Sequence, residues 1–126
     1  MKKIIALGLL ACIFVTTVAA QKTSEKMLRH VVLFKFKDTA SAAGVKSVEV
    51  AFMALKEKIS LVKDLEWGTN NSPEKLNEGL THCFFATFSS EKDREDYLVH
   101  PAHKAFVEIL KPYLEKVVVI DYWAKK

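Results

Sequence analysis

Hydrophobic and polar residues alternate along two segments of the chain, as they do in β-strands that cover one side of a core. In residues 28–37 one face of the alternation carries His30, Val32, Phe34 and Phe36. In residues 81–89 one face carries His82, Phe84, Ala86 and Phe88. The pattern predicts a strand in each segment.

Two shorter patterns predict further strands. Residues 65–67 precede Gly68 and a segment, residues 69–73, that is rich in the turn formers Asn, Ser and Pro. Residues 116–123 contain the apolar run 117–120. Both faces of this last strand are therefore apolar, as they are in residues 81–89.

From Ala42 a period of about 3.6 residues replaces the alternation and predicts an amphipathic helix. Its apolar stripe consists of Val48, Phe52, Leu55, Ile59 and Val62. The opposite face carries Glu49, Lys56 and Lys63. We expect one helix over residues 42–62 with a charged outer face.

Two more helices are expected on either side of Pro101. Ser90, with Asp93 three residues later, resembles a capping box and predicts a helix over residues 91–99. His100 ends this helix because a residue before proline is disfavoured in helical conformation. Pro101 suits the first turn of the next helix, which we expect His100 to cap.

The apolar stripe of this last helix consists of Ala105, Phe106, Ile109, Leu110 and Tyr113. Pro112 falls late in the same stretch, where its ring predicts a kink.

The order of elements is then strand, helix, strand, strand, two helices and strand. This order is typical of a ferredoxin-like α+β fold, an antiparallel sheet with helices on one face. Residues 27–124 form one domain in this interpretation, and residues 21–26 are a short flexible lead-in. The uncovered apolar face predicts a homodimer, in which two sheets face each other and close into a dimeric α+β barrel.

The start of the chain is typical of a cleaved signal peptide over residues 1–20. Two lysines precede the apolar run 4–20, which ends in small residues. The alternatives are an uncleaved anchor, which needs roughly 20 apolar residues, and a lipoprotein acylated at Cys12. Cleavage after Ala20 predicts an exported protein, periplasmic or secreted, that meets the membrane only through its signal peptide.

Charge narrows the class of partner. The chain has 19 basic and 15 acidic residues, and removal of Lys2 and Lys3 leaves 17 basic residues and a net charge of +2. These charges are interleaved, as in residues 91–96, whereas nucleic-acid-binding proteins show a clustered basic excess. We therefore expect no nucleic-acid partner. Cys83 has no partner for an internal disulfide once Cys12 is removed.

Five ordered motifs resemble the stress-responsive A/B barrel (Dabb) family across the whole mature domain. They are residues 30–38 (HVVLFKFKD), 66–68 (EWG), 78–82 (EGLTH), 96–103 (DYLVHPAH) and 121–122 (DY). The family is known for small dimeric α+β barrels, and most of its members have no assigned function. Its characterised members include plant stress proteins and a polyketide cyclase that works without a cofactor.

The resemblance to the cyclase implies a site in this chain. The cyclase's catalytic tyrosine and histidine match Tyr97 and His103, and its supporting histidines match His30 and His82. In such chemistry His103 is the general base that takes a proton next to a carbonyl, and Tyr97 hydrogen-bonds the oxygen that gains charge.

Phe34 and Phe84 are expected to face the barrel interior, where they line the ligand cavity with His30 and His82 and narrow it. Tyr97 and His103 are expected at the mouth of this cavity.

Three functions remain open. The first is an exported dimer that binds a small, partly aromatic molecule in the barrel cavity. The second is a structural or stress-related dimer without catalysis, and the third is a cofactor-free cyclase-like lyase that uses Tyr97 and His103. No metal site is expected, because zinc needs three or four converging ligands. No cofactor is expected either, since the sequence has no glycine-rich phosphate-binding loop.

Overall fold

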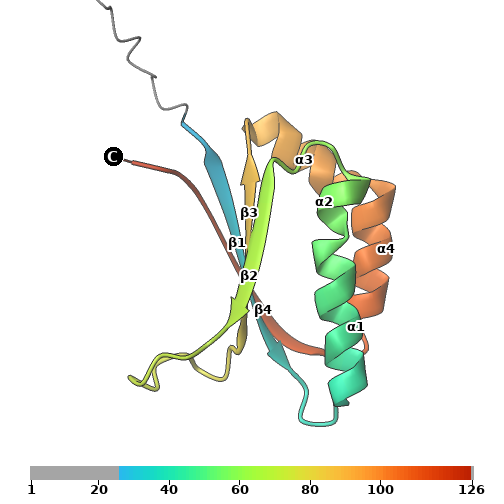
Figure 1. Cartoon of the computed structure of the whole chain (residues 1–126), viewed down its shortest axis with the longest axis vertical. Coiled ribbons are helices and arrows are strands. Elements are labelled where there is room, and N and C mark those ends of the chain that lie inside the picture. Colours follow the sequence, from blue (N-terminus) through green and yellow to red (C-terminus); the bar gives the residue numbers. More distant parts are fainter. Residues whose placement is uncertain (1–25, 126) are drawn as a thin grey trace, which may run out of the picture.

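The computed structural model describes residues 26–125 and contains a four-stranded antiparallel sheet and four helices. The strands are β1 (Leu28–Phe36), β2 (Asp64–Thr69), β3 (His82–Phe88) and β4 (Leu114–Trp123). The helices are α1 (Ala42–Met53), α2 (Leu55–Lys58), α3 (Glu91–Val99) and α4 (Pro101–Leu110). The strands lie in the order β2-β3-β1-β4, and the helices cover one side of the sheet (Figure 1). The ferredoxin-like arrangement expected from the sequence is confirmed.

The strand register assigns side chains to the two faces of the sheet. Val32 on β1 lies opposite Phe84 on β3 and Val119 on β4. Since successive side chains point to opposite faces, His30 and Phe34 share the face of Val32, which is the face under the helices. This face and the helical stripes form the core, which consists of Leu28, Val32, Phe34, Val48, Phe52, Leu55, Ile59, Val62, Leu65, Phe84, Ala86, Phe88, Tyr97, Phe106 and Leu110.

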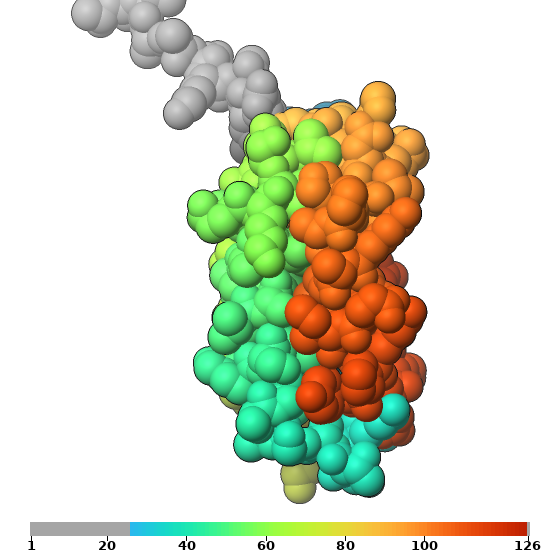
Figure 2. Space-filling model, turned by 90° about the vertical axis from the view of Figure 1, so that its right-hand side faces the viewer, coloured from blue at the N-terminus to red at the C-terminus, as the bar shows by residue number. Residues whose placement is uncertain are grey.

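Phe52 anchors α1 to the sheet and to α4. Its ring stacks on Phe84, with the ring centroids 4.0 Å apart, and meets Phe106 edge-on at 4.9 Å. Burial of one such side chain stabilises the fold by about 1.5 to 3 kcal/mol. Figure 2 shows the outer side of this layer, where α1 and α2 lie beside α4.

Three side chains fix the starts of the longer helices. Ser41 accepts a hydrogen bond from the N–H of Gly44 at 3.0 Å, and Ser90 accepts one from the N–H of Asp93 at 3.0 Å. At the corner between α3 and α4, the Nδ1 of His100 accepts from the N–H of Ala102 at 3.1 Å. The capping roles expected for Ser90 and His100 are confirmed, and each satisfies an N–H that has no partner within the helix.

The helix expected over residues 42–62 is shorter in the structure. Helix α1 ends at Met53, α2 adds about one turn, and Ile59 has an extended backbone with φ of −129°. Ile59 and Val62 are still buried, because the chain turns toward β2 with the same side inward. The kink expected at Pro112 is also wrong, since α4 ends at Leu110 before the proline is reached.

The face of the sheet opposite the helices is uncovered in the part of the chain that the structure describes. Ile120 and Tyr122 of β4 lie on this open face and are 53% and 43% exposed. Val117 and Val119, on the helix side of the same strand, are also exposed, so the helical layer does not fully cover this edge strand.

The expectation that Phe34 and Phe84 face the interior of a barrel between two sheets is wrong. Both rings lie on the helix side, where they are 1% and 0% exposed. The physical reason is that the apolar stripes of the helices pack on this face, where Phe52 of α1 contacts both rings.

The signal peptide and cleavage site predicted from the sequence, and Cys12, lie outside the residues that the structure describes. Among the helices found in residues 26–125, none has the length and apolar character needed to cross a bilayer.

Candidate functional site

A cavity of about 530 Å³ lies between the sheet and helices α3 and α4. Much of its wall is apolar and consists of Val32, Phe34, Phe52, Leu98, Phe106, Val107, Leu110, Leu114, Val117 and Val119. The polar lining residues are His30, Arg94, Glu95, Tyr97, His103 and Asp121. The polar and apolar lining residues of β1 and β4 lie toward opposite ends of the cavity. His30 pairs with Asp121 toward one end of β1, and Phe34 pairs with Val117 toward the other.

His103 of α4 presents one ring nitrogen as an acceptor. Its Nδ1 lies 3.1 Å from the backbone carbonyl oxygen of Leu98. A carbonyl oxygen only accepts, so Nδ1 carries the proton and Nε2 of the neutral ring keeps its lone pair. Burial lowers the pKa of His103, the Leu98 carbonyl opposes this effect, and a positive charge on His30 would lower the pKa further. The neutral ring, with a basic Nε2, is therefore favoured at pH 7.

Tyr97 of α3 lies beside His103, with the ring centroids 4.6 Å apart. The residue is 1% exposed, and burial raises the pKa of its hydroxyl well above the usual range. The hydroxyl therefore stays protonated and serves as a hydrogen-bond donor. A basic nitrogen next to a hydroxyl donor can take a proton from a ligand while stabilising charge that develops on a ligand oxygen.

His30 of β1 completes the polar end of the cavity. Its ring lies 5.9 Å from that of Tyr97, measured between centroids. Its Nδ1 lies 2.6 Å from Oδ1 of Asp121, and the other oxygen of this carboxylate lies 2.6 Å from Nη1 of Arg94. Asp121 thus bridges a buried histidine and a half-buried arginine.

His82 lies outside this cavity, near the other end of the sheet. Its Nε2 is 3.1 Å from Oε1 of Glu49, and its Nδ1 is 2.8 Å from the hydroxyl of Thr81. The ring also stacks on Trp67, with the centroids 5.8 Å apart. Both ring nitrogens have protein partners, so the arrangement is that of a buried residue joining α1 to β3.

The structure brings three of the four residues expected from the cyclase resemblance, His30, Tyr97 and His103, to one cavity. Phe34 lines this cavity as well, whereas Phe84 is buried behind it in the core. The cavity lies inside one protomer beneath its helices, and not between two sheets.

Arg94 and Asp121 are site residues that were not predicted from the sequence. Arg94 falls within the charged run 91–96, yet it precedes Tyr97 by three residues and so shares its helix face. Asp121 is the single acid after the apolar run of β4, in phase with Val117 and Val119. These two spacings are signals from which each residue could be placed on the side of the site, although they do not show that the two residues pair.

Glu49 was assigned to the charged outer face of its helix, and this assignment is wrong. Its side chain reaches under the helix to His82. Burial would raise the pKa of Glu49, but hydrogen bonds from His82 and Lys46 outweigh it, so the pKa is lowered. Glu49 precedes Phe52 by three residues, which places both on neighbouring positions of the buried side.

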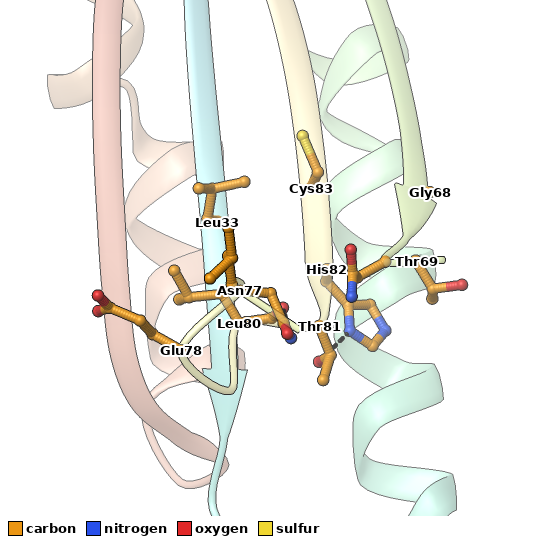
Figure 3. A pocket seen from close by; sticks show the side chains of 11 residues that line it. Leu33, Gly68, Thr69, Asn77, Glu78, Leu80, Thr81, His82 and Cys83 are labelled. Carbon is orange, nitrogen blue, oxygen red and sulfur yellow. Dashed lines mark hydrogen bonds between the residues drawn. The ribbon is translucent and has the colours of Figure 1, made fainter. Parts of the chain in front are cut away.

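A second cavity, of about 410 Å³, lies on the open face of the sheet. Figure 3 shows Leu33 of β1 and Cys83 of β3 at its floor, with Asn77 and Leu80 of the β2–β3 connection beside them. Burial raises the pKa of the Cys83 thiol, and the charge of Glu66 adds to the effect. The thiol therefore stays protonated and is a weak nucleophile.

Metal ligands do not converge in residues 26–125, where no group of three or more His, Cys, Asp or Glu side chains is placed to hold an ion.

Comparison of sequences identifies relatives along most of the chain. Residues 28–124 match the family model of the stress responsive A/B barrel domain, Dabb. Olivetolic acid cyclase of Cannabis sativa is 31% identical over 99 residues, which cover 79% of this chain and 98% of the cyclase. A stress-response A/B barrel domain-containing protein of Arabidopsis thaliana is 38% identical over 95 residues, which cover 75% of this chain and 87% of that protein.

Solved structures share the same fold. Hydroxynitrile lyase of Passiflora edulis matches with a TM-score of 0.76 at 26% identity, over 82% of this chain and 97% of the lyase. A dimeric protein with a ferredoxin-like fold from Bacteroides fragilis matches with a TM-score of 0.64 at 30% identity, over 78% of this chain and 96% of that protein. The chain belongs to the Dabb family of stress-responsive A/B barrel domains.

Proposed function

We propose that the cavity beneath α3 and α4 binds a small, partly aromatic molecule that carries a carbonyl group, and that His103 and Tyr97 move a proton on it. The observation that carries this proposal is that the ring of His103, with its basic Nε2, lies 4.6 Å from the ring of Tyr97 at the polar end of an apolar cavity. His103 takes a proton next to the carbonyl, and Tyr97 donates a hydrogen bond to the carbonyl oxygen as it gains charge. The proposed chemistry uses side chains of this chain alone.

Two kinds of observation support a proton-transfer function. The relatives include a cyclase and a lyase by name, so this fold accommodates enzymes. The wall of the cavity is mostly apolar, and its charged residues are Arg94, Glu95 and Asp121. Their charges sum to −1, which favours an uncharged ligand over an anionic one.

The proposal extends to the assembly and location of the protein. A homodimer through the open face would cover Ile120 and Tyr122, and a structural relative with this fold is described as dimeric. The basic and apolar start of the sequence supports export to the periplasm or out of the cell. In this proposal each protomer keeps its own cavity, because the dimer forms on the opposite face of the sheet.

A thermal-shift screen with small aromatic aldehydes, ketones and phenols tests the ligand proposal. A ligand at one hundred times its dissociation constant adds about 2.7 kcal/mol to the free energy of unfolding. We expect this stabilisation to disappear in His103→Gln and Tyr97→Phe. It should persist in His100→Asn, a matched control three residues away in which asparagine still caps α4.

A flat response of the wild-type protein to every compound would overturn the ligand proposal and favour the structural dimer. Equal loss of stabilisation in His100→Asn would contradict the assignment of the site to His103 and Tyr97.

A further inference from the structure

The side chains of Arg94, Asp121 and His30 form a continuous chain of hydrogen bonds from α3 through β4 to β1. The two distances, Arg94 Nη1 to Asp121 Oδ2 and Asp121 Oδ1 to His30 Nδ1, are both 2.6 Å. Each carboxylate oxygen therefore has its own donor. The arginine and aspartate side chains are 20% and 22% exposed and that of His30 is 6% exposed, so water screens these charges only partly.

We infer that Arg94 is a positioning residue for the cavity: it holds Asp121 as the fixed acceptor of the His30 Nδ1 proton and keeps His30 neutral with Nε2 free as an acceptor. This role rests on the proposed function, because a positioned imidazole matters only where the cavity takes a ligand. Arg94 acts through Asp121 and is not itself the group that takes the proton.

The charge balance explains why the arginine is needed. Asp121 alone beside His30 would favour the imidazolium form, since a neighbouring opposite charge favours the charged state of a group. The guanidinium is always charged and occupies the second oxygen of Asp121, so it offsets this attraction. An imidazolium that is almost fully buried is also costly. With Arg94 present, the guanidinium balances the carboxylate charge while Nδ1 of His30 keeps its hydrogen bond to Asp121.

No other titratable group around His30 replaces Arg94. Helix α3 supplies Tyr97, Arg94 and the acidic Glu95, α4 supplies His103, and β4 supplies Asp121. Strand β3 contributes Phe88 and Ala86, which do not titrate. Arg94 is therefore the one cation held against Asp121 among residues 26–125.

The state of His30 also affects the proposed base. Burial is the main cause that lowers the pKa of His103, and positive charge on His30 lowers it further. If loss of Arg94 leads to protonation of His30, the cavity loses the acceptor Nε2 of His30. The added positive charge also makes His103 harder to protonate.

Histidine side-chain NMR of the full chain without ligand tests the inference. We expect the wild-type protein at pH 7 to show His30 neutral, protonated on Nδ1. In Arg94→Gln the Nε2 resonance should move toward that of an imidazolium, and in Asp121→Asn it should remain that of a neutral ring with the Nδ1 tautomer less populated. Arg94→Lys should restore most of the wild-type spectrum, and Lys92→Gln, on the exposed side of the same helix, should not change it.

The opposite responses of the two variants separate positioning from a structural role, because a merely structural contact would disturb both spectra alike. An unchanged His30 spectrum in a folded Arg94→Gln protein, or equal changes in Lys92→Gln, would overturn the inference. The conservative Arg94→Lys variant keeps the test available if the glutamine variant does not fold. His30 resonances like those of the wild-type protein, unchanged by added chloride and by pH between 6 and 8, support the inference. Full charging of His30 in this variant overturns it. Since this readout needs no ligand, a flat thermal-shift screen overturns the proposed function separately.

Discussion

Because Nδ1 of His103 carries a proton, Nε2 is the ring atom that can act as a base toward a ligand. The Leu98 carbonyl holds that proton, and burial lowers the pKa of the ring. We predict a titration midpoint for His103 below 6.5, the ordinary value for histidine, with the neutral ring protonated on Nδ1. Histidine NMR between pH 4 and 8 measures both quantities. A midpoint at or above 6.5, or a neutral ring protonated on Nε2, would contradict the proposed base.

The pair of Glu49 and His82 predicts a pH-dependent contribution to stability. The pKa of Glu49 is lowered in the folded protein, so its contribution is present above pH 4.5, the ordinary pKa, and is lost as the pH falls through the folded value. Glu49→Gln should lower the free energy of unfolding by on the order of 1 kcal/mol at pH 7 and by less at pH 3.

Urea unfolding at the two pH values measures this difference. Glu108→Gln, which removes an exposed ion pair with Lys111, is the control and should change stability little at either pH. A loss in Glu49→Gln that is the same at pH 7 and pH 3 would show that the carboxylate charge does not contribute.

At the scale of the elements, α1 approaches Tyr113, three residues after the end of α4, closely enough to predict the effect of a substitution. A Cβ atom added at Gly44 would overlap the ring of Tyr113, whereas one added at Gly68 of β2 meets no atom within 4 Å. Gly44→Ala should therefore destabilise the fold by about 1 to 3 kcal/mol, the usual cost of overpacking. Gly68→Ala should leave it unchanged or raise stability by up to about 1 kcal/mol.

Denaturant unfolding of both variants measures the contrast. Gly44→Ala combined with Tyr113→Ala should recover the part of the loss that comes from overlap. Equal stability of the two single variants would mean that α1 does not approach Tyr113 as closely as the structure indicates.

Element boundaries show how far the sequence alone can go. The strands of residues 28–36 and 82–88 follow from alternation, and the ends of α3 and the start of α4 follow from Ser90 and Pro101. The end of α1 does not, because Ile59 and Val62 stay on the buried side after the helix has ended. A hydrophobic period predicts which side chains of a segment are buried. It does not determine the backbone conformation of that segment.

The site was predictable to a similar extent. Tyr97, His103 and His30 could be named from the resemblance of the motifs to a family, but their grouping in one cavity depends on the register of β1 and the corner at His100. The location of the cavity under the helices could not be predicted, because alternation shows that two faces differ without showing which one the helices cover. The ion pair of Arg94 and Asp121 joins segments 27 residues apart, so only the packing of α3 on the sheet reveals it.

At the scale of the whole molecule, the open face predicts self-association. Ile120 is 53% exposed on this face, and Val50 of α1 is 59% exposed on the outer side of the helical layer. We predict a dimer at micromolar concentration that Ile120→Asp weakens on the order of 100-fold, because the interface would bury an unpaired carboxylate. Val50→Asp should leave association unchanged. Sedimentation that finds only monomer in the wild-type protein would contradict the dimer.

The central claim is that the cavity beneath α3 and α4, and not the one on the open face, takes the ligand. Backbone and side-chain NMR shifts, followed while an aromatic ketone or aldehyde from the thermal-shift screen is added, test it most directly. We predict saturable shifts at Tyr97, His103 and Phe106, with little change at Leu33 and Cys83. Saturable shifts confined to Leu33 and Cys83, or no saturable shift at either cavity, would contradict it.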